Sequence, residues 1–247
     1  MEYCCVTDPG KVRDHNEDSV AIVKNVNDEI LMAVSDGMGG HRGGEIASSI
    51  AINVLTKRFS AFDKLGKKEE TIVWIRDAVS EANMEIYKYT KEHPESEGMG
   101  TTIVLAILTH DYLLFGNIGD SSGFVIKNDK LHKITMDHTL VNLLVKSGEL
   151  TEEEAKNHPR KNVLMRALGA VVDVEMDIFD VTDDVDGILL CSDGLTNMLT
   201  EDQIMKVLDE DHVGPDKLQK LVIKCNNRGG TDNISIAYLK KGGKKSW

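Results

Sequence analysis

Cysteine is scarce in this chain of 247 residues, which contains four. Cys4 and Cys5 are adjacent, Cys191 and Cys225 stand far apart, and the pattern CxxC does not occur. Disulfide frameworks and cysteine zinc sites need regular pairs, so neither class of protein fits. We expect all four cysteines to be small, buried residues in reduced surroundings.

Long apolar runs are also missing. The longest aliphatic run, Ile103 to Leu108, is far shorter than the roughly 20 residues that cross a bilayer. The first residues, MEYCCVTDPGKVR, have no apolar segment behind a basic start, so a signal peptide is not expected. These features predict a cytoplasmic protein without a membrane partner.

Positive charge is in short supply. Lysine and arginine together number 29 against 41 acidic residues, which gives a net charge of -12. A nucleic-acid-binding surface would need a basic patch, so nucleic acid is not an expected partner. The sequence GxxxxGK[ST] of the phosphate loop in NTPases is absent, as is the DxDxDG spacing of calcium loops.

Secondary-structure signals indicate a mixture of antiparallel strands and helices in one domain, residues 1–240, with a frayed tail at 241–247. Ten short segments read as strands: Tyr3–Thr7, Ser19–Lys24, Ile30–Ser35, Thr101–Thr109, Tyr112–Asn117, Gly123–Lys127, Lys130–Ile134, Val174–Val181, Ile188–Ser192 and Ile234–Leu239. Long amphipathic helices are expected over Glu45–Phe62 and Glu69–His93, and shorter ones after Thr200 and over Asp216–Cys225. Residues 138–165 read as a small helical insert, with a helix over Leu140–Ser147 and a capping box at Thr151. Sheets packed together and covered by helices, an α+β fold, follow from this order.

Carboxylates stand at the ends of several predicted strands. Asp36 and Asp193 each follow an apolar strand inside the sequence SDG. The others are Glu17, Asp18, Asp120 and Asp232. Any one of them could be an ordinary turn residue. The repeated SDG favours a cation, because a buried strand that ends in a bare carboxylate is costly without one.

Oxygen ligands without a histidine or cysteine cluster point to Mg²⁺ or Mn²⁺. Two such ions could activate a water and hold a phosphoryl group. Arg13, in VRDHNED, is either a surface residue or a bidentate phosphate ligand. Carboxylates, metal and arginine together indicate hydrolysis of a phosphate ester.

Six motifs in order, GKVRDHNEDS, SDGMGGHRGGE, GMGTT, GNIGDSS, CSDGLTNML and GGTDNIS, resemble those of type 2C metal-dependent Ser/Thr protein phosphatases. The resemblance is to the compact bacterial form, a catalytic domain alone, and covers residues 1–240. It implies a four-layer α-β-β-α sandwich in which 138–165 is a flap. It also implies hydrolysis of phosphoserine and phosphothreonine by direct attack of a metal-bridging hydroxide. Such a protein would be a monomer that reverses a bacterial Ser/Thr kinase.

The resemblance assigns roles to individual residues. Asp36 would bridge two ions and Gly37 would offer its carbonyl, while Asp193 and Asp232 would bind one of these ions. Glu17 and Asp18 would hold metal-bound waters, and Asp120 with Asp193 would bind a third ion. Arg13 would bind the substrate phosphate and Asn233 would support the metal loop. Gly100-Thr101-Thr102 would be a structural turn and strand start.

Two positions depart from the family pattern. Met38 stands where many eukaryotic members have a histidine that acts as the general acid. His41 and His15 are each either near the ions or on the surface. Ser122 replaces a common arginine. A binding module without turnover would share the fold but lack ligands, and every ligand position is filled here.

Overall fold

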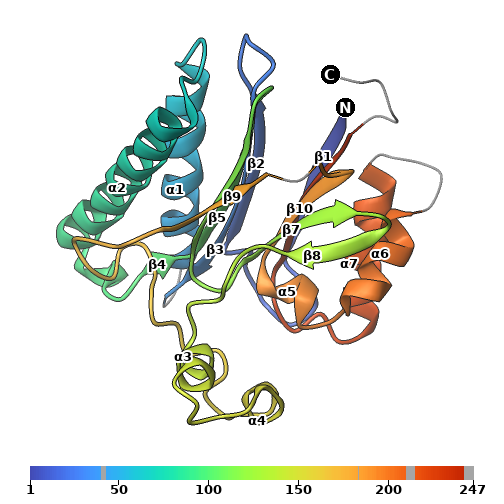
Figure 1. Ribbon diagram of the computed structural model, residues 1–247. Helices are drawn as coiled ribbons and strands as arrows, with labels where there is room; N and C mark the ends of the chain where they lie inside the picture. The colour runs from blue at the N-terminus through green and yellow to red at the C-terminus, as the bar shows by residue number, and fades with distance from the viewer. Residues whose placement is uncertain (40–42, 183, 210–214, 242–247) are drawn as a thin grey trace.

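The computed structural model describes residues 1–39, 43–182, 184–209 and 215–241. The described residues form two antiparallel sheets that pack face to face, each covered on its outer side by helices (Figure 1). This arrangement confirms the predicted α-β-β-α sandwich. No helix in these ranges is long and apolar enough to span a membrane.

The first sheet has the strand order β1-β11-β10-β7-β8. Its strands are β1 (Glu2–Asp8), β11 (Ile234–Lys240), β10 (Gly187–Cys191), β7 (Ser122–Lys127) and β8 (Lys130–Lys133). The first and last strands of the chain pair along their whole length, from Glu2 opposite Lys240 to Asp8 opposite Ile234. Residues just before β11 are therefore brought beside the loop that follows β1.

The second sheet has the order β2-β3-β5-β6-β9, and the short β4 pairs with the end of β3. Its strands are β2 (Asp18–Lys24), β3 (Ile30–Met38), β4 (Gly100–Thr101), β5 (Ile103–Leu108), β6 (Leu113–Ile118) and β9 (Asp177–Val181). Asp18 and Asp36 stand opposite each other where β2 begins and β3 ends.

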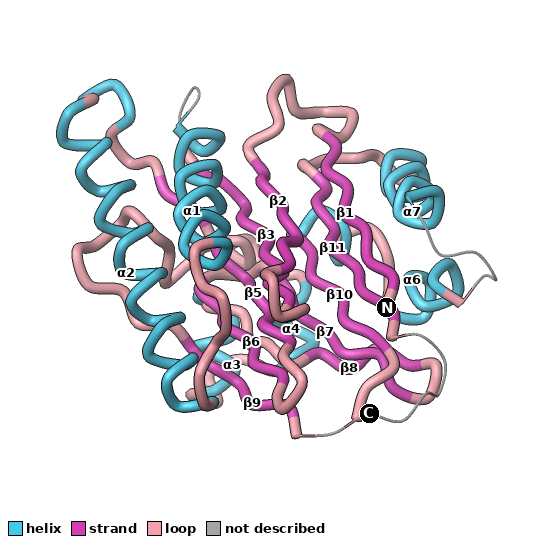
Figure 2. Tube along the Cα trace, turned by 90° about the horizontal axis from the view of Figure 1, so that it is seen from above, coloured by secondary structure: helices cyan, strands magenta, loops and turns pink. Residues whose placement is uncertain are grey.

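Helices α1 (Gly43–Ser60) and α2 (Lys68–Glu92) cover the second sheet, while α5 (Asp193–Thr196), α6 (Glu201–Leu208) and α7 (Pro215–Asn227) cover the first. Figure 2 shows the strands between these two groups of helices. A 3-10 turn, Pro94–Ser96, follows α2. Helices α3 (Leu140–Lys146) and α4 (Glu152–Lys156) lie apart from the four layers (Figure 1).

Strand β3 explains why the sandwich holds together. Ile30, Met32 and Val34 belong to the core between the sheets, while Leu31 and Ala33 belong to the core under α1 and α2. Successive side chains of a strand point to opposite faces, so a strand covered on both faces is continuously apolar. The run from Ile30 to Val34 is therefore buried on both sides, and it carries Asp36 to the end of the sandwich.

All ten predicted strands and the predicted helices are present, with small shifts in their ends. Thr101–Thr109 is divided at Thr102, and the short α5 and the 3-10 turn were not predicted. The expectation for cysteine is wrong in part: Cys191 and Cys225 are buried, but Cys4 is half-buried and Cys5 is exposed. The reason is that β1 lies at the edge of its sheet. Residues 242–247 of the predicted tail lie outside the described residues.

Candidate active site

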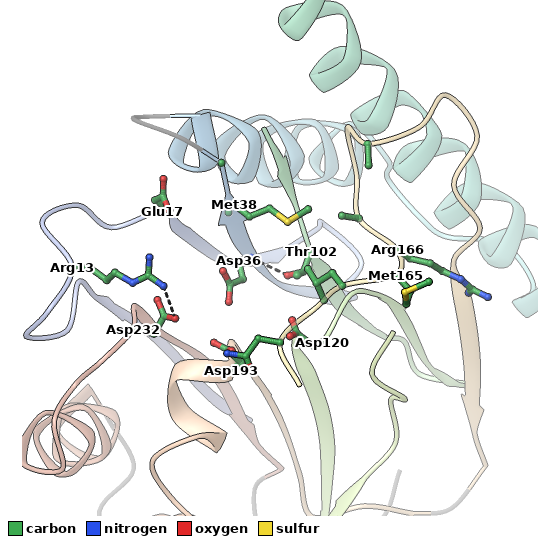
Figure 3. A pocket seen from close by; sticks show the side chains of 16 residues that line it. Arg13, Glu17, Asp36, Met38, Thr102, Asp120, Met165, Arg166, Asp193 and Asp232 are labelled. Carbon is green, nitrogen blue, oxygen red and sulfur yellow. Dashed lines mark hydrogen bonds and ion pairs between the residues drawn. The ribbon is translucent and has the colours of Figure 1, made fainter. Parts of the chain in front are cut away.

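A cavity of about 420 Å³ lies where the strand ends of both sheets meet. Glu17, Asp36, Asp120, Asp193 and Asp232 line it together with Arg13. Figure 3 shows these side chains around one space, and they come from separate segments of the chain, with Asp36 in β3 and Asp193 at the start of α5. The structure thus brings together five of the six predicted carboxylates, and the sixth, Asp18, is the strand partner of Asp36.

The backbone of Asp36 is held by two threonines. Its N–H donates to Thr102 Oγ1 at 3.0 Å, and its carbonyl accepts from the Thr102 N–H at 2.9 Å and from Thr101 Oγ1 at 2.8 Å. Burial raises the pKa of the Asp36 carboxyl well above its ordinary value, and the nearby carboxylates, led by Asp18, raise it further. The sequence predicted a structural turn and strand start at Thr101 and Thr102; in the structure their hydroxyls hold the backbone of Asp36.

Gly37 follows Asp36 because no larger residue fits there. A Cβ atom at this position would lie 2.1 Å from the carbonyl oxygen of Gly44 and 2.4 Å from that of Glu17. The Gly37 N–H donates to the Glu17 carbonyl at 3.1 Å. The same restriction applies to the second SDG, residues 192–194. A Cβ at Gly194 would lie 2.0 Å from the Asn233 carbonyl oxygen, so no larger residue fits there either.

The buried carboxylates lack enough partners to balance their charge. Ser192 Oγ donates to Asp18 Oδ2 at 2.7 Å, but Asp18 Oδ1 and Asp193 Oδ1 are buried without a hydrogen-bond partner among the described residues. Burial raises the pKa of Asp18 and of Asp120 to about 7, and that of Asp193 to about 6. Ionised carboxylates placed this way call for a bound cation.

The donor set fits hard divalent ions. Every ligand candidate offers oxygen, which suits Mg²⁺ or Mn²⁺. Within the described ranges, no three His, Cys, Asp or Glu side chains are placed so that together they could hold an ion. Coordination would therefore rely on water as well as on the carboxylates, which is usual for Mg²⁺.

Arg13 reaches the cavity from the loop after β1. Its Nη2 lies 2.9 Å from Asp232 Oδ2. Burial lowers the pKa of the guanidinium, but the hydrogen bond and charge of Asp232, with Glu17 and Asp36, outweigh this and raise it. The side chain is 50% exposed, so part of the guanidinium remains open to a ligand.

Asn233 joins the segment before β11 to the loop between β1 and β2. Its Nδ2 donates to the carbonyls of Pro9 at 2.9 Å and His15 at 3.0 Å, and its Oδ1 accepts from the Glu17 N–H at 2.8 Å. Asn233 thus makes three hydrogen bonds to the segment between Pro9 and Glu17. Arg13, Glu17 and Asp232 keep their relative positions because this amide fastens the two loops together.

Other predicted residues take different places. His41 lies outside the described residues, and His15 is exposed. Met38 lines the cavity but carries no acidic proton. Ser122 is buried in β7 opposite Cys191. Burial strongly raises the pKa of the Cys191 thiol, which makes it a poor nucleophile.

Sequence reasoning placed the flap, 138–165, beside the site but did not single out the residues that form the second wall of the cavity. It is formed by Asn162, Leu164, Met165, Arg166, Ala167 and Ala170, which follow α4. Figure 3 shows the Arg166 side chain directed away from Asp36. Its Nη1 instead donates to Asp177 Oδ1 at 2.8 Å. The sequence did contain one signal for this wall, the single arginine, Arg166, within the apolar stretch VLMRALGA. Its ion-pair partner, Asp177, cannot be predicted from spacing in the sequence.

Comparison with known proteins gives concordant matches. The pattern of the protein phosphatase 2C family matches residues 11–219. The serine/threonine phosphatase stp of Listeria monocytogenes is 40% identical over 236 residues, 95% of this chain and 94% of that protein. The protein phosphatase PhpP of Streptococcus pneumoniae is 35% identical over 242 residues, 97% of each chain.

Solved structures agree with the sequence matches. The serine/threonine phosphatase of S. agalactiae superposes with a TM-score of 0.88 at 36% identity, covering 96% of this chain and 98% of that one. The serine/threonine phosphatase Stp1 of Staphylococcus aureus gives a TM-score of 0.91 at 34% identity, covering 98% and 96%. Both similarities extend over the whole sandwich.

Proposed function

Because the chain belongs to the protein phosphatase 2C family, and is a serine/threonine protein phosphatase, we propose that the carboxylates around Asp36 hold its catalytic metal ions. The family is metal-dependent and its substrates are phosphoproteins. The observation that carries the proposal is the set of five carboxylates that line one cavity beside a half-exposed arginine. Asp193, in the cavity, and Asp18, the strand partner of Asp36, each have a buried oxygen without a hydrogen-bond partner among the described residues.

Each carboxylate has a place in this proposal. Asp36 would contact two central Mn²⁺ or Mg²⁺ ions, with the Gly37 carbonyl, Asp193 and Asp232 completing the protein ligands. Glu17 and Asp18 would act through water, and Asp120 with Asp193 would bind a third ion. Bound ions of this kind lower the pKa of water and offset charge on a phosphoryl group.

The protein itself supplies rigidity and charge. Thr101 and Thr102 keep the Asp36 backbone from moving as ligands exchange, and Asn233 does the same for the loops of Arg13 and Asp232. Arg13 would bind two phosphate oxygens with its planar fork. Met38 cannot donate a proton, so the leaving serine or threonine oxygen would take one from water.

The cellular setting completes the proposal. We place residues 1–240 in one catalytic domain, with 138–165 as a flap beside the cavity, acting as a monomer in the bacterial cytoplasm. The relatives in Listeria and Streptococcus support the bacterial part of this setting. The enzyme would act opposite a bacterial Ser/Thr kinase: it would remove the phosphate groups that the kinase adds to its substrate proteins.

The test is hydrolysis of a small aryl phosphate with purified protein. We expect turnover that requires added Mn²⁺ or Mg²⁺ and that is lost in excess EDTA. A phosphopeptide-binding module without turnover would instead bind phosphopeptide under both conditions and release no phosphate. Full activity in excess EDTA would contradict the assignment of the carboxylates to metal.

A further inference from the structure

His138 begins the proposed flap and is bound to the turn that carries Asp120. Its side chain is 9% exposed. The Gly119 N–H donates to His138 Nδ1 at 3.2 Å, and the His138 N–H donates back to the Gly119 carbonyl at 2.9 Å. This reciprocal pair fixes the residue that immediately precedes Asp120.

Gly119 has no side chain of its own that could fix the turn, and no larger residue fits at this position. Its φ of +104° lies in the region that favours glycine, and a Cβ there would lie 2.5 Å from the Thr102 methyl group. The position of the turn therefore depends on hydrogen bonds from other elements. His138 provides two of them, and Asn117 Nδ2 provides a third to the Gly119 carbonyl at 3.2 Å.

The other ring nitrogen of His138 faces Asp177 at the start of β9. Since Nδ1 accepts from Gly119, the proton of the neutral ring is on Nε2, which lies 3.1 Å from Asp177 Oδ2. The second oxygen, Asp177 Oδ1, accepts from Arg166 at 2.8 Å. One carboxylate thus holds the first residue of the flap and the residue that directly follows the flap.

The two ends of the flap are also joined by their backbones. The Met165 N–H donates to the His138 carbonyl at 2.8 Å, and the Leu140 N–H donates to the Val163 carbonyl at 2.9 Å. Thr139 and Leu164 form an isolated antiparallel bridge. The cavity wall at Met165 and Arg166 is consequently fastened to His138.

On its other side, Asp120 is tied to Asp36. Ser121 Oγ and Thr102 Oγ1 are 2.7 Å apart, and Thr102 Oγ1 also accepts from the Asp36 N–H. Asp120 therefore stands between two anchored neighbours, Gly119 toward the flap and Ser121 toward the central carboxylate.

We propose that His138 is a positioning residue that, through Gly119, sets the Asp120 carboxylate for metal binding and couples it to the flap held by Asp177 and Arg166. The proposal rests on the proposed role of Asp120 as a ligand. Groups that orient metal ligands commonly change metal affinity 10- to 100-fold when removed, which gives the scale of the expected effect.

Two variants separate the two contacts of the ring. His138→Asn places an oxygen near the position of Nδ1, so it can still accept from Gly119 but loses the donor to Asp177. His138→Gln places an amide nitrogen near the position of Nε2, so it can still donate to Asp177 but loses the acceptor for Gly119. Both are neutral and similar in size, and thermal melting shows whether each is folded.

The first measurement is Mn²⁺ binding, followed by the electron paramagnetic resonance signal of free Mn²⁺. For His138→Gln we expect the Asp120-dependent site, identified by its loss in Asp120→Asn, to bind about 10-fold more weakly. For His138→Asn we expect a change within about twofold, because the acceptor is preserved. The second measurement is backbone hydrogen exchange, where the Gly119 N–H should exchange faster in His138→Gln than in His138→Asn.

The proposal would be overturned if both variants kept the Mn²⁺ affinity and the Gly119 exchange rate of the wild-type protein. Equal losses in both would also overturn it, since they would show a general effect of removing the ring. Failure of the wild-type protein to bind Mn²⁺ would contradict the proposed function. In that case the exchange comparison would still decide whether His138 holds the turn.

Discussion

Hydrogen bonds to its backbone hold Asp36 in place, while its carboxyl group lines the cavity. Three hydrogen bonds with Thr101 and Thr102 hold its backbone: the Asp36 N–H donates one and the Asp36 carbonyl accepts two. Burial among other carboxylates raises its pKa, so the carboxyl pays an electrostatic penalty in the absence of a cation. A residue positioned this way is costly for the fold and useful for binding metal.

Replacing Asp36 with asparagine should separate these two effects. Asp36→Asn keeps the size of the side chain and removes its charge, so we expect turnover to fall by at least about 1,000-fold, the scale of losing a central electrostatic group. The melting temperature without metal should stay equal or rise, because repulsion among the carboxylates decreases. Phosphate release and thermal melting measure the two quantities. Wild-type turnover in this variant would show that Asp36 is not the bridging ligand.

Arg13 should act mainly on substrate binding. We expect Arg13→Ala to raise KM for an aryl phosphate about 10-fold, the value of one lost charge-assisted hydrogen bond, with a smaller change in kcat. Arg13→Lys is the matched control, because it keeps the charge but loses the planar fork of the guanidinium. Its KM should lie between those of the wild-type protein and Arg13→Ala. Steady-state kinetics at saturating Mn²⁺ provide the comparison. An unchanged KM in Arg13→Ala would remove this residue from phosphate binding.

At the scale of elements, helix α1 starts directly against Gly37 at the end of β3 and against Glu17. A Cβ at Gly44 would lie 2.8 Å from Glu17 Cδ and 2.8 Å from the backbone carbon of Gly37. The first turn of α1 therefore sets the distance between β3 and the loop of Glu17. The glycines of SDGMGGHRGGE that the structure describes allow close packing of backbone, rather than flexibility.

Gly44→Ala tests this packing. Alanine is the better helix former by about 1 kcal/mol, so propensity alone predicts a gain in stability. We expect the opposite, a loss of about 1–3 kcal/mol, because the added methyl group overpacks the contact with Glu17 and Gly37. Asn53→Ala, on the exposed side of α1, is the control and should not lower stability. Urea unfolding measures both, and a stabilised Gly44→Ala would refute the argument.

Elements were predictable from the sequence where a local pattern decides them. Alternation of apolar residues or richness in β-branched residues located the ten predicted strands, and the capping boxes at Thr151 and Thr200 located α4 and α6. The carboxylates of the site were predictable because each stands at a strand end. Helix α5, Asp193–Thr196, is too short to show a period.

Contacts between segments that are distant in the sequence could not be predicted from the sequence. The hydroxyl of Thr102 meets the Asp36 N–H, and Asp177 meets His138, only after the sheets have formed. The exposure of Cys5 depends on β1 being an edge strand, which its composition does not reveal. Side-chain hydrogen bonds across the fold follow from tertiary structure, and no spacing rule anticipates them.

At the scale of the whole molecule, an acidic chain concentrates several buried carboxylates at one end of the sandwich. The net charge is -12, and the pairing of β1 with β11 brings the first and last segments of the chain to the same place. Assembly of the site therefore requires the complete fold. Its electrostatic cost is distributed over Asp18, Asp36, Asp120 and Asp193.

This cost predicts how the stability of the metal-free protein depends on pH. The pKa values of Asp18 and Asp120 are raised from 3.8 to about 7, and that of Asp193 to about 6. Between about pH 4 and 7 the folded chain binds more protons than the unfolded chain, so its unfolding free energy falls as pH rises. Each group contributes at most about 1.4 kcal/mol per pH unit in this interval.

Metal should reverse that loss. Mn²⁺ binds the ionised carboxylates, so protons and metal compete, and a concentration 100-fold above Kd adds about 2.7 kcal/mol. We expect the melting temperature in EDTA to fall between pH 5 and pH 7.5, and the difference between Mn²⁺ and EDTA to widen over the same interval. Asp18→Asn should flatten the profile in EDTA, because it removes one of the raised carboxyls. A difference between Mn²⁺ and EDTA that is the same at every pH would show that these carboxylates do not receive the metal.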